Sequence, residues 1–260
     1  MTFVIAEAAS THDGSLERAL KLVSIAAEAG ADACKFQFWS DADKLADRRH
    51  ADDYYRAIYH RYRMPVEWLQ VLRNDCYIHG IEFMCTTFLK EDIHVVEPFV
   101  KRFKIASFEA SDSTFLSWHN DFDKPVIIST GLMYLEEIED SMAALRQPRT
   151  VLHCVSAYPC HQPNLAVIPK MRGRWGDHCA GFSDHTANVL TGALAVAAGA
   201  QVVEVHFKAP DTDPANPDCA VAVPDLAQYI ANIRYAERMM GDGVKRPTGE
   251  EAEMMKYRVA

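Results

Sequence analysis

Residues 3–38 read FVIAEAASTHDGSLERALKLVSIAAEAGADACKFQF, and this stretch decides the fold class. Phe3–Ala8 and Ala33–Phe38 are short apolar runs of the length of a buried strand. Between them, apolar residues recur at helical spacing over residues 16–27, and the pattern stops at Gly30. The order strand, helix, strand predicts two parallel strands joined by a helix.

The same alternation continues along the whole chain, with helical patterns at residues 133–142, 188–198 and 224–240. The apolar character of the strands is continuous, as expected for parallel strands covered on both sides. Eight such units close a (β/α)8 barrel, and 260 residues suit one. We therefore predict an α/β single-domain TIM barrel over residues 1–260, with a doubly wound open sheet as the alternative. The predicted strands are Phe3–Ala8, Ala33–Phe38, Glu82–Thr87, Arg102–Ser107, Pro125–Thr130, Thr150–Ser156, Cys179–Asp184 and Gln201–Phe207.

Composition limits the classes of function. Apolar residues make up 49% and charged residues 24%, which is typical of a globular domain. The net charge of −9 argues against nucleic-acid binding, which selects basic faces. No segment approaches the ~20 apolar residues of a membrane span, and residues 1–10 lack the pattern of a signal peptide, so we expect a cytoplasmic protein without membrane partners. Scattered cysteines without a CxxC pair indicate reduced thiols: Cys34, Cys76, Cys85, Cys154, Cys160, Cys179 and Cys219.

One long connection interrupts the alternation. Asp41–Arg63 is rich in Asp, Arg, His and Tyr and lies between the second strand and a helix that begins near Pro65. A connection of this length after a strand is typical of a lid or a binding loop. The alternative is a surface excursion with a short helix of its own.

Polar and ionisable residues lie at the carboxyl end of every predicted strand, where barrel enzymes carry their catalytic groups. Charged groups inside apolar strands are costly to bury without partners, so we interpret them as the lining of one polar cavity. The charged and imidazole members are Glu7, Lys35, Lys104, Glu109, His153, Asp184, His185, Glu204 and His206.

His185 and His206 end adjacent predicted strands, so their imidazoles can share one divalent cation. Two histidines leave coordination positions open, and water, substrate oxygens or a carboxylate such as Glu7 would complete the set. The mixed nitrogen and oxygen donors suit Mn²⁺, Fe²⁺ or Co²⁺, and Zn²⁺ as well. The alternative is a pair of hydrogen-bonded core histidines.

Lys35 and Lys104 predict an anion pocket for a phosphate or a carboxylate. A Schiff-base lysine and structural ion pairs with Glu7 or Glu109 remain alternatives. Two carboxylates that face a metal and two lysines can relay protons, or they can simply neutralise the lysines. The residues alone leave these alternatives open.

Taken in order, the motifs of the whole chain resemble those of the sialic acid synthase (N-acetylneuraminate synthase) family. Each motif is weak alone, but eight in register are specific. They are AEAASTHDG at Ala6–Gly14, KFQ at Lys35–Gln37, CTTF at Cys85–Phe88, KIASFE at Lys104–Glu109, STGL at Ser129–Leu132, HCVSAYP at His153–Pro159, GFSDHT at Gly181–Thr186 and EVHF at Glu204–Phe207.

The resemblance implies a role for each matching residue. His185 and His206 would bind the metal, for which we expect Mn²⁺, with Mg²⁺ or Co²⁺ as alternatives. Glu7 would act beside it, and Phe88 would pack at the pocket wall. Phosphoenolpyruvate would be held by Lys35, Thr86, Lys104, Ser107, Ser129 and Ser183, with Ser156 where some members place an asparagine. The acceptor sugar would face Gln37, Glu109, Tyr158 and Asp218, the last within NPDCAVAVPDL at Asn216–Leu226.

The resemblance also implies the reaction: metal-dependent condensation of phosphoenolpyruvate with an aldose, such as N-acetylmannosamine or a related amino sugar. The products would be a 3-deoxy-2-keto sugar acid of the sialic or nonulosonic type and phosphate. Two alternatives stay open. One is a pyruvate aldolase or lyase with Lys104 as Schiff base, and the other is a non-catalytic sugar-binding barrel.

The sequence also departs from the family pattern. Members usually carry a C-terminal antifreeze-like domain, and this sequence stops at Tyr257–Ala260, about where a linker would begin. The domain is therefore truncated, supplied by a separate chain or dispensable. The resemblance further implies a homodimer. Thr11 and Asp13 replace asparagines and Thr87 replaces a proline, whereas both histidines and both lysines are kept, so the acceptor is less determined than the reaction.

Overall fold

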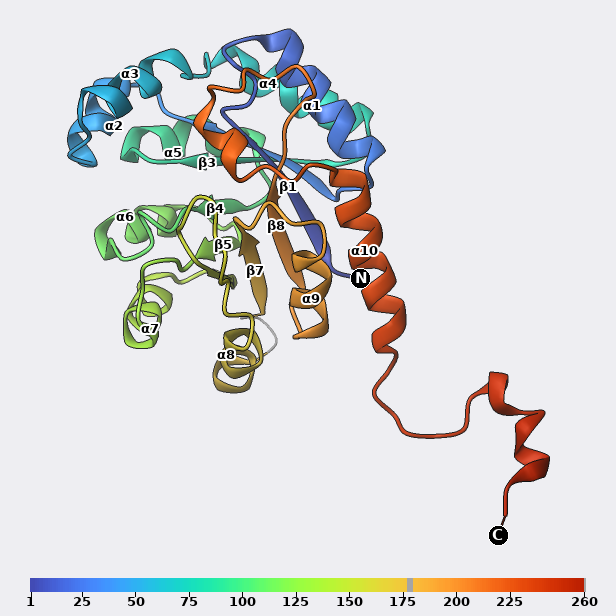
Figure 1. The fold of residues 1–260 in the computed structure, drawn as a ribbon. Coiled ribbons are helices and arrows are strands. Elements are labelled where there is room, and N and C mark those ends of the chain that lie inside the picture. Colours follow the sequence, from blue (N-terminus) through green and yellow to red (C-terminus); the bar gives the residue numbers. More distant parts are fainter. Residues whose placement is uncertain (177–179, 260) are drawn as a thin grey trace.

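In the computed structural model, residues 1–176 and 180–259 are described. Within them, eight parallel strands pair in sequence order and the last pairs with the first, which closes a barrel (Figure 1). The (β/α)8 prediction is confirmed, and the open sheet is excluded. Predicted and observed strand limits agree within a few residues, except that Cys179, the predicted start of the seventh strand, lies outside the described residues. The strands are β1 (Phe3–Ala9), β2 (Ala33–Phe38), β3 (Glu82–Thr87), β4 (Phe103–Ile105), β5 (Val126–Ser129), β6 (Arg149–Cys154), β7 (Gly181–Asp184) and β8 (Val202–His206).

Helices surround the barrel and begin where the sequence places caps. Ser15 caps the first of them by accepting a hydrogen bond from the Arg18 amide, and Gly30 follows its end with a φ of +87°. The last one begins two residues later than predicted, at Leu226: Asp225 is its N-cap, so Pro224 lies outside the first turn. The helices are α1 (Leu16–Glu28), α2 (Ala42–Arg48), α3 (Asp53–Arg61), α4 (Glu67–Ile78), α5 (Lys90–Val96), α6 (Ser113–Ser117), α7 (Leu135–Ala144), α8 (Val167–Trp175), α9 (Thr191–Ala197) and α10 (Leu226–Met240).

The barrel interior is built in layers. Its lower layer is an apolar cluster of Ile5, Ala33, Met84, Ile127 and Leu152. Because side chains on a strand alternate with a period of two, the residues two positions further along point to the same interior. Four of those five positions hold polar groups, namely Glu7, Lys35, Thr86 and Ser129, and the fifth is Cys154. A polar floor therefore lies directly above an apolar plug.

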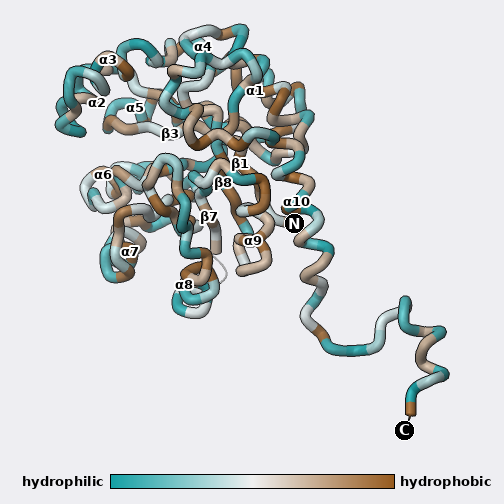
Figure 2. The backbone as a smooth tube through the Cα atoms, in the orientation of Figure 1, coloured by the Kyte–Doolittle hydropathy of each residue, from teal (hydrophilic) through white to brown (hydrophobic). Residues whose placement is uncertain are grey.

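Strand register brings the charged groups to one level. Glu7 is paired in register with Lys35 on one side and with His206 on the other, and Thr86 is paired with Lys104. The larger apolar core lies between the strands and the helices. Figure 2 shows the contrast between apolar β8 and α9 and the largely hydrophilic α2 and α3.

The insertion after β2 folds into two short helices, α2 and α3, which lie at one side of the barrel mouth (Figure 1). A separate small apolar cluster of Trp39, Ala42, Leu45, Tyr62 and Phe88 joins it to the barrel. The insertion thus has helices of its own and also covers part of the mouth. We call α2, α3 and the residues between them the lid.

Beyond α10, residues 241–259 are exposed and run away from the barrel (Figures 1 and 2). Among the helices of the described residues, none has the length and apolar character that a membrane crossing requires.

Candidate active site

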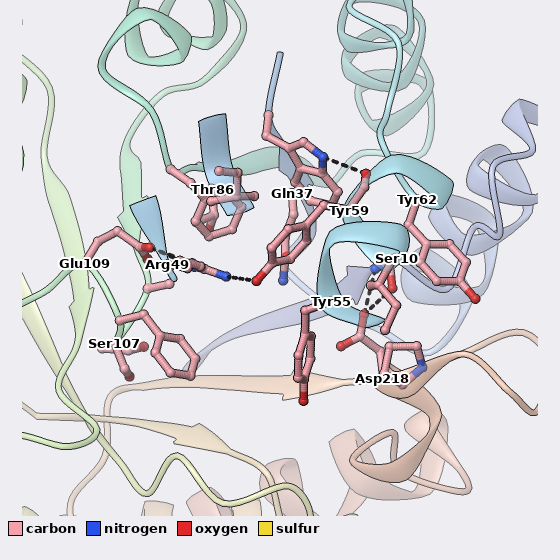
Figure 3. A pocket seen from close by; sticks show the side chains of 18 of the residues that line it. Ser10, Gln37, Arg49, Tyr55, Tyr59, Tyr62, Thr86, Ser107, Glu109 and Asp218 are labelled. Carbon is pink, nitrogen blue, oxygen red and sulfur yellow. Dashed lines mark hydrogen bonds and ion pairs between the residues drawn. The ribbon is translucent and has the colours of Figure 1, made fainter. Parts of the chain in front are cut away.

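A cavity of about 930 Å³ opens at the carboxyl end of the barrel, between the strand ends and the lid (Figure 3). Of the residues predicted for the site, the structure brings fourteen to its walls: Glu7, Lys35, Gln37, Thr86, Phe88, Lys104, Ser107, Glu109, Ser129, Tyr158, Ser183, His185, His206 and Asp218. Ser156 does not line the cavity; its hydroxyl lies 4.0 Å from the Cys154 sulfur.

The floor is a buried network of four charged side chains. Lys35 forms an ion pair with Glu7, and its Nζ lies 4.0 Å from Oε1 of Glu204. Lys104 Nζ lies 3.4 Å from Oε2 of the same Glu204. All four side chains are at most 5% exposed, so the lysines depend on these carboxylates for charge compensation.

Burial and neighbouring charges set the protonation of this network. Burial raises the pKa of Glu7 to about 7, although Lys35 opposes the shift. Burial also disfavours the charge on Glu204, but Lys104 and Lys35 outweigh it and lower that pKa. Burial lowers the pKa of Lys104, whereas for Lys35 the carboxylates of Glu204 and Glu7 outweigh burial and raise the pKa. Burial thus disfavours the charge on Glu7, so Glu204 is the main counter-charge of the two lysines, and the floor can take an anion as a further partner.

Hydroxyl groups surround the lysines. Lys35 donates a 2.9 Å hydrogen bond to the Thr86 hydroxyl, and Lys104 donates a 2.8 Å bond to the Ser129 hydroxyl. Ser183 donates to Glu204, and the Ser107 oxygen accepts from the Gly131 amide. Ammonium and hydroxyl donors at such spacing are suited to phosphate and carboxylate oxygens.

His185 and His206 stand side by side, with ring centres 5.3 Å apart. An ion bound ~2.1 Å from one nitrogen of each ring lies about 3.2 Å from each ring centre, so two ligating rings are about 5 Å apart. Nδ1 of His185 lies 2.9 Å from the Val155 carbonyl, an arrangement that puts the proton on Nδ1 and leaves Nε2 as a lone-pair donor. Nδ1 of His206 is buried without a hydrogen-bond partner in the described part of the chain.

The pair therefore fits a shared metal ion that takes its remaining ligands from water or substrate. Within residues 1–176 and 180–259, no three or more His, Cys, Asp or Glu side chains lie close enough together to hold one metal ion.

The outer cavity carries the residues predicted to face an acceptor. Gln37 donates a 3.0 Å bond to Glu7, and Asp218 accepts a 3.0 Å bond from the Ser10 amide (Figure 3). The Tyr158 ring packs against His185, with 4.3 Å between ring centres and a tilt of 35° between the rings. Glu109 receives two hydrogen bonds from Arg49. Of the alternative lysine ion pairs, the one between Lys35 and Glu7 is formed, whereas Glu109 pairs with Arg49 and with no lysine of the described residues.

The sequence predicts Glu204 as part of the cavity lining but gives it no role; in the structure it lies between both lysines, two residues before His206 on the same strand. Two further residues that shape the cavity, Ser10 and Arg49, were not predicted as site residues. Ser10 holds Asp218. Arg49 comes from the lid, and no local pattern around it indicates a contact with Glu109.

A closed (β/α)8 barrel with a charged cavity at the carboxyl ends of its strands has the architecture of a barrel enzyme. The NeuB family model matches residues 22–245. The chain therefore belongs to the NeuB family, as its motifs predict, and it is an enzyme of the sialic acid synthase type.

Individual relatives of known name support this family assignment. The chain is 31% identical to N,N'-diacetyllegionaminic acid synthase of Campylobacter jejuni over 96% of this chain and 80% of that protein. It is 33% identical to a pseudaminic acid synthase of the same species, over 93% and 75% of the two chains. The solved structure of N-acetylneuraminic acid synthetase from Leptospira borgpetersenii superposes with a TM-score of 0.89 at 27% identity, over 99% of this chain and 91% of that one.

Proposed function

We propose that this enzyme condenses phosphoenolpyruvate with an aldose of the amino sugar class to give a 3-deoxy-2-keto sugar acid and phosphate. The observation that carries the proposal is the position of the lysine pair and its hydroxyl groups on the floor, with the histidine pair on the wall of the same cavity. The relatives named as legionaminic and pseudaminic acid synthases support the amino sugar.

Lys35 and Lys104 neutralise the carboxylate and phosphate of phosphoenolpyruvate, and the hydroxyls of Thr86, Ser129 and Ser183 complete the donor set. These groups are already held in place by one another, so binding the anion needs little reorganisation.

His185 and His206 would hold the divalent ion, with Mn²⁺ as our first choice; when bound, it supplies Lewis-acid polarisation of the aldehyde oxygen. In the reaction, carbon 3 of phosphoenolpyruvate forms a bond to the aldehyde carbon, the aldehyde oxygen takes up a proton, and carbon 2 becomes cationic. Water adds at carbon 2 and releases one proton; the carbon–oxygen bond to phosphate breaks, and the proton of the new hydroxyl leaves with the phosphate as the keto group forms. Glu7, with a pKa of about 7, is suited to give a proton to the aldehyde oxygen and to take up the one that the added water releases.

The test is a screen of neutral, acylamino and phosphorylated aldoses with phosphoenolpyruvate and Mn²⁺, in which released phosphate is measured. We expect phosphate release that strictly requires one class of aldose. Release without an aldose, or no release with any, would contradict the proposal. Borohydride trapping with pyruvate separates the Schiff-base alternative, since only that mechanism would label Lys104 covalently.

We further propose that the reaction takes place in the cytoplasm. The described cysteines, Cys34, Cys76, Cys85, Cys154, Cys160 and Cys219, are all free thiols, which supports a reducing compartment. The homodimer, and the source of any antifreeze-like domain, stay predictions. Size-exclusion chromatography with light scattering tests the first.

A further inference from the structure

We infer that Arg49 is a specificity-determining residue that binds an uncharged substituent of the acceptor aldose together with Glu109. The inference rests on the proposed function, because it assigns the outer cavity to the aldose. It adds a lid residue that none of the site motifs contains.

Arg49 and Glu109 each keep hydrogen-bonding capacity that no described protein group uses. A guanidinium has five N–H donors, and Arg49 uses three: two toward Oε1 of Glu109, at 3.2 and 2.7 Å, and one toward the Tyr59 hydroxyl at 3.4 Å. Two N–H groups are thus left without a described protein partner. Oε2 of Glu109 is buried and has no hydrogen-bond partner in the described residues. The pair therefore offers donors and an acceptor at one place.

Both residues face the cavity where an aldose must lie. Arg49 and Glu109 are among its lining residues, and Figure 3 shows Arg49 between Glu109 and Tyr59. Tyr158, whose ring packs against His185, lines the same cavity. The lysine floor is more deeply buried than Arg49, whose side chain is 21% exposed. An aldehyde near the histidines and an anion on the floor leave this outer part for the remaining sugar.

Aromatic rings fix the guanidinium in place. Its central carbon lies 4.6 Å from the ring centre of Phe88, 5.2 Å from Phe108 and 5.9 Å from Tyr59. Such rings restrain the arginine before a ligand binds, and this lowers the entropy cost of binding. Phe108 is 54% exposed and adds an apolar contact beside the polar pair.

Charge decides the class of substituent. Arg49 and Glu109 together carry no net charge, so the pair does not attract an anion over distance. A phosphate placed here would face the unpartnered carboxylate oxygen of Glu109 and be repelled. A neutral group that accepts from Arg49 and donates to Glu109 satisfies both residues; an acylamino group and a hydroxyl group share this chemistry.

The test compares wild type, Arg49→Met, Arg49→Lys and Arg56→Met with N-acetylmannosamine, mannose, N-acetylmannosamine 6-phosphate and the best aldose of the screen. Arg56 is the control, because it pairs with Asp43 and Asp47 within the lid and does not line the cavity. We expect Arg49→Met to raise the KM for the neutral aldose by about 10- to 100-fold, as for the loss of a hydrogen bond from a charged group. The KM for phosphoenolpyruvate should not change, and Arg49→Lys should restore part of the loss.

The comparison between aldoses shows which sugar substituent Arg49 binds. A KM effect confined to N-acetylmannosamine assigns the acylamino group, and an equal effect on mannose assigns a hydroxyl. The inference is overturned if Arg49→Met leaves the aldose KM unchanged, if it raises both KM values equally as a purely structural lid residue would, or if wild type prefers the phosphorylated sugar. Wild type without turnover on any aldose would instead overturn the proposed function, and the inference with it.

Discussion

Tyr229 of α10 donates a 2.8 Å hydrogen bond from its buried hydroxyl to Oδ2 of Asp184, the residue before His185. Asp184 also accepts from the Thr186 amide through its other oxygen. The last helix therefore fixes the end of the strand that carries one of the proposed metal ligands, from the side opposite the cavity wall formed by the lid.

Tyr229→Phe should lower the free energy of unfolding by about 1–3 kcal/mol, because it leaves a buried carboxylate oxygen without its donor. It should also weaken Mn²⁺ binding, since His185 loses its support. Urea denaturation and calorimetric titration with Mn²⁺ measure the two effects. Tyr235→Phe, on the exposed face of the same helix, is the matched control. Equal stability of both variants would contradict the role of this bond.

Loss of either proposed metal ligand should abolish turnover without unfolding the barrel. His206→Ala removes an imidazole whose Nδ1 has no described hydrogen-bond partner, so no protein hydrogen bond at that atom is broken. We expect loss of Mn²⁺ binding in calorimetry, an unchanged circular dichroism spectrum and loss of phosphate release. Chelator treatment of wild type should give the same loss, reversed by Mn²⁺. Full activity of His206→Ala would show that the metal assignment is wrong.

Lys104→Met should mainly weaken phosphoenolpyruvate binding. Lys104 bonds to the Ser129 hydroxyl and faces Glu204, so its removal deletes an ammonium group and also leaves a less compensated carboxylate. An increase in Kd of about 10- to 100-fold is expected from the loss of a charge-assisted hydrogen bond. Calorimetry without aldose measures it, with Lys101→Met, an exposed position, as control. An unchanged Kd would remove Lys104 from the anion pocket.

Because His12 is buried, we expect the protein to lose stability in mild acid. Burial lowers its pKa to about 4, with Asp13 opposing, and its Nδ1 accepts a hydrogen bond from the Gly14 amide. Because the unfolded state takes up this proton near pH 6.5 and the folded state only near pH 4, stability is complete above about 6.5 and falls as the pH decreases toward 4. The loss is up to about 3 kcal/mol, as expected for a shift of this size.

His12→Gln should flatten this pH dependence, measured as the free energy of urea unfolding between pH 7 and pH 4. His119, whose burial likewise lowers its pKa to about 4, is kept in both proteins, so the difference between the two curves isolates His12. Parallel curves would mean that His12 does not contribute.

Much of the fold follows from local sequence. The runs at Phe3–Ala9 and Ala33–Phe38 are mostly apolar and are buried on both faces, as in parallel strands that helices cover. The fourth strand was predicted too long, because the chain turns after Ile105: the amides of Glu109 and Ala110 bond back to Ala106 and Ser107. That turn carries Ser107 and Glu109 into the cavity.

The site was less completely predictable. Residues on strand ends were found because the barrel brings all strand ends together. Arg49 could not be found this way, because its contact with Glu109 spans sixty positions and depends on how α2 packs. Glu204 was visible in the sequence, but its position between two lysines depends on the register of β8 with β7 and β1.

The lid is one uninterrupted stretch of chain that meets the barrel through a small apolar cluster around Trp39 and Phe88. The charged residues of the cavity floor, by contrast, lie on the strands of the barrel. The part of the sugar pocket that the lid supplies, Arg49 included, can therefore be exchanged as one segment: replacing Asp41–Arg63 by the corresponding segment of another synthase changes the surroundings of Glu109 and leaves the residues that bind the enolpyruvyl donor in place.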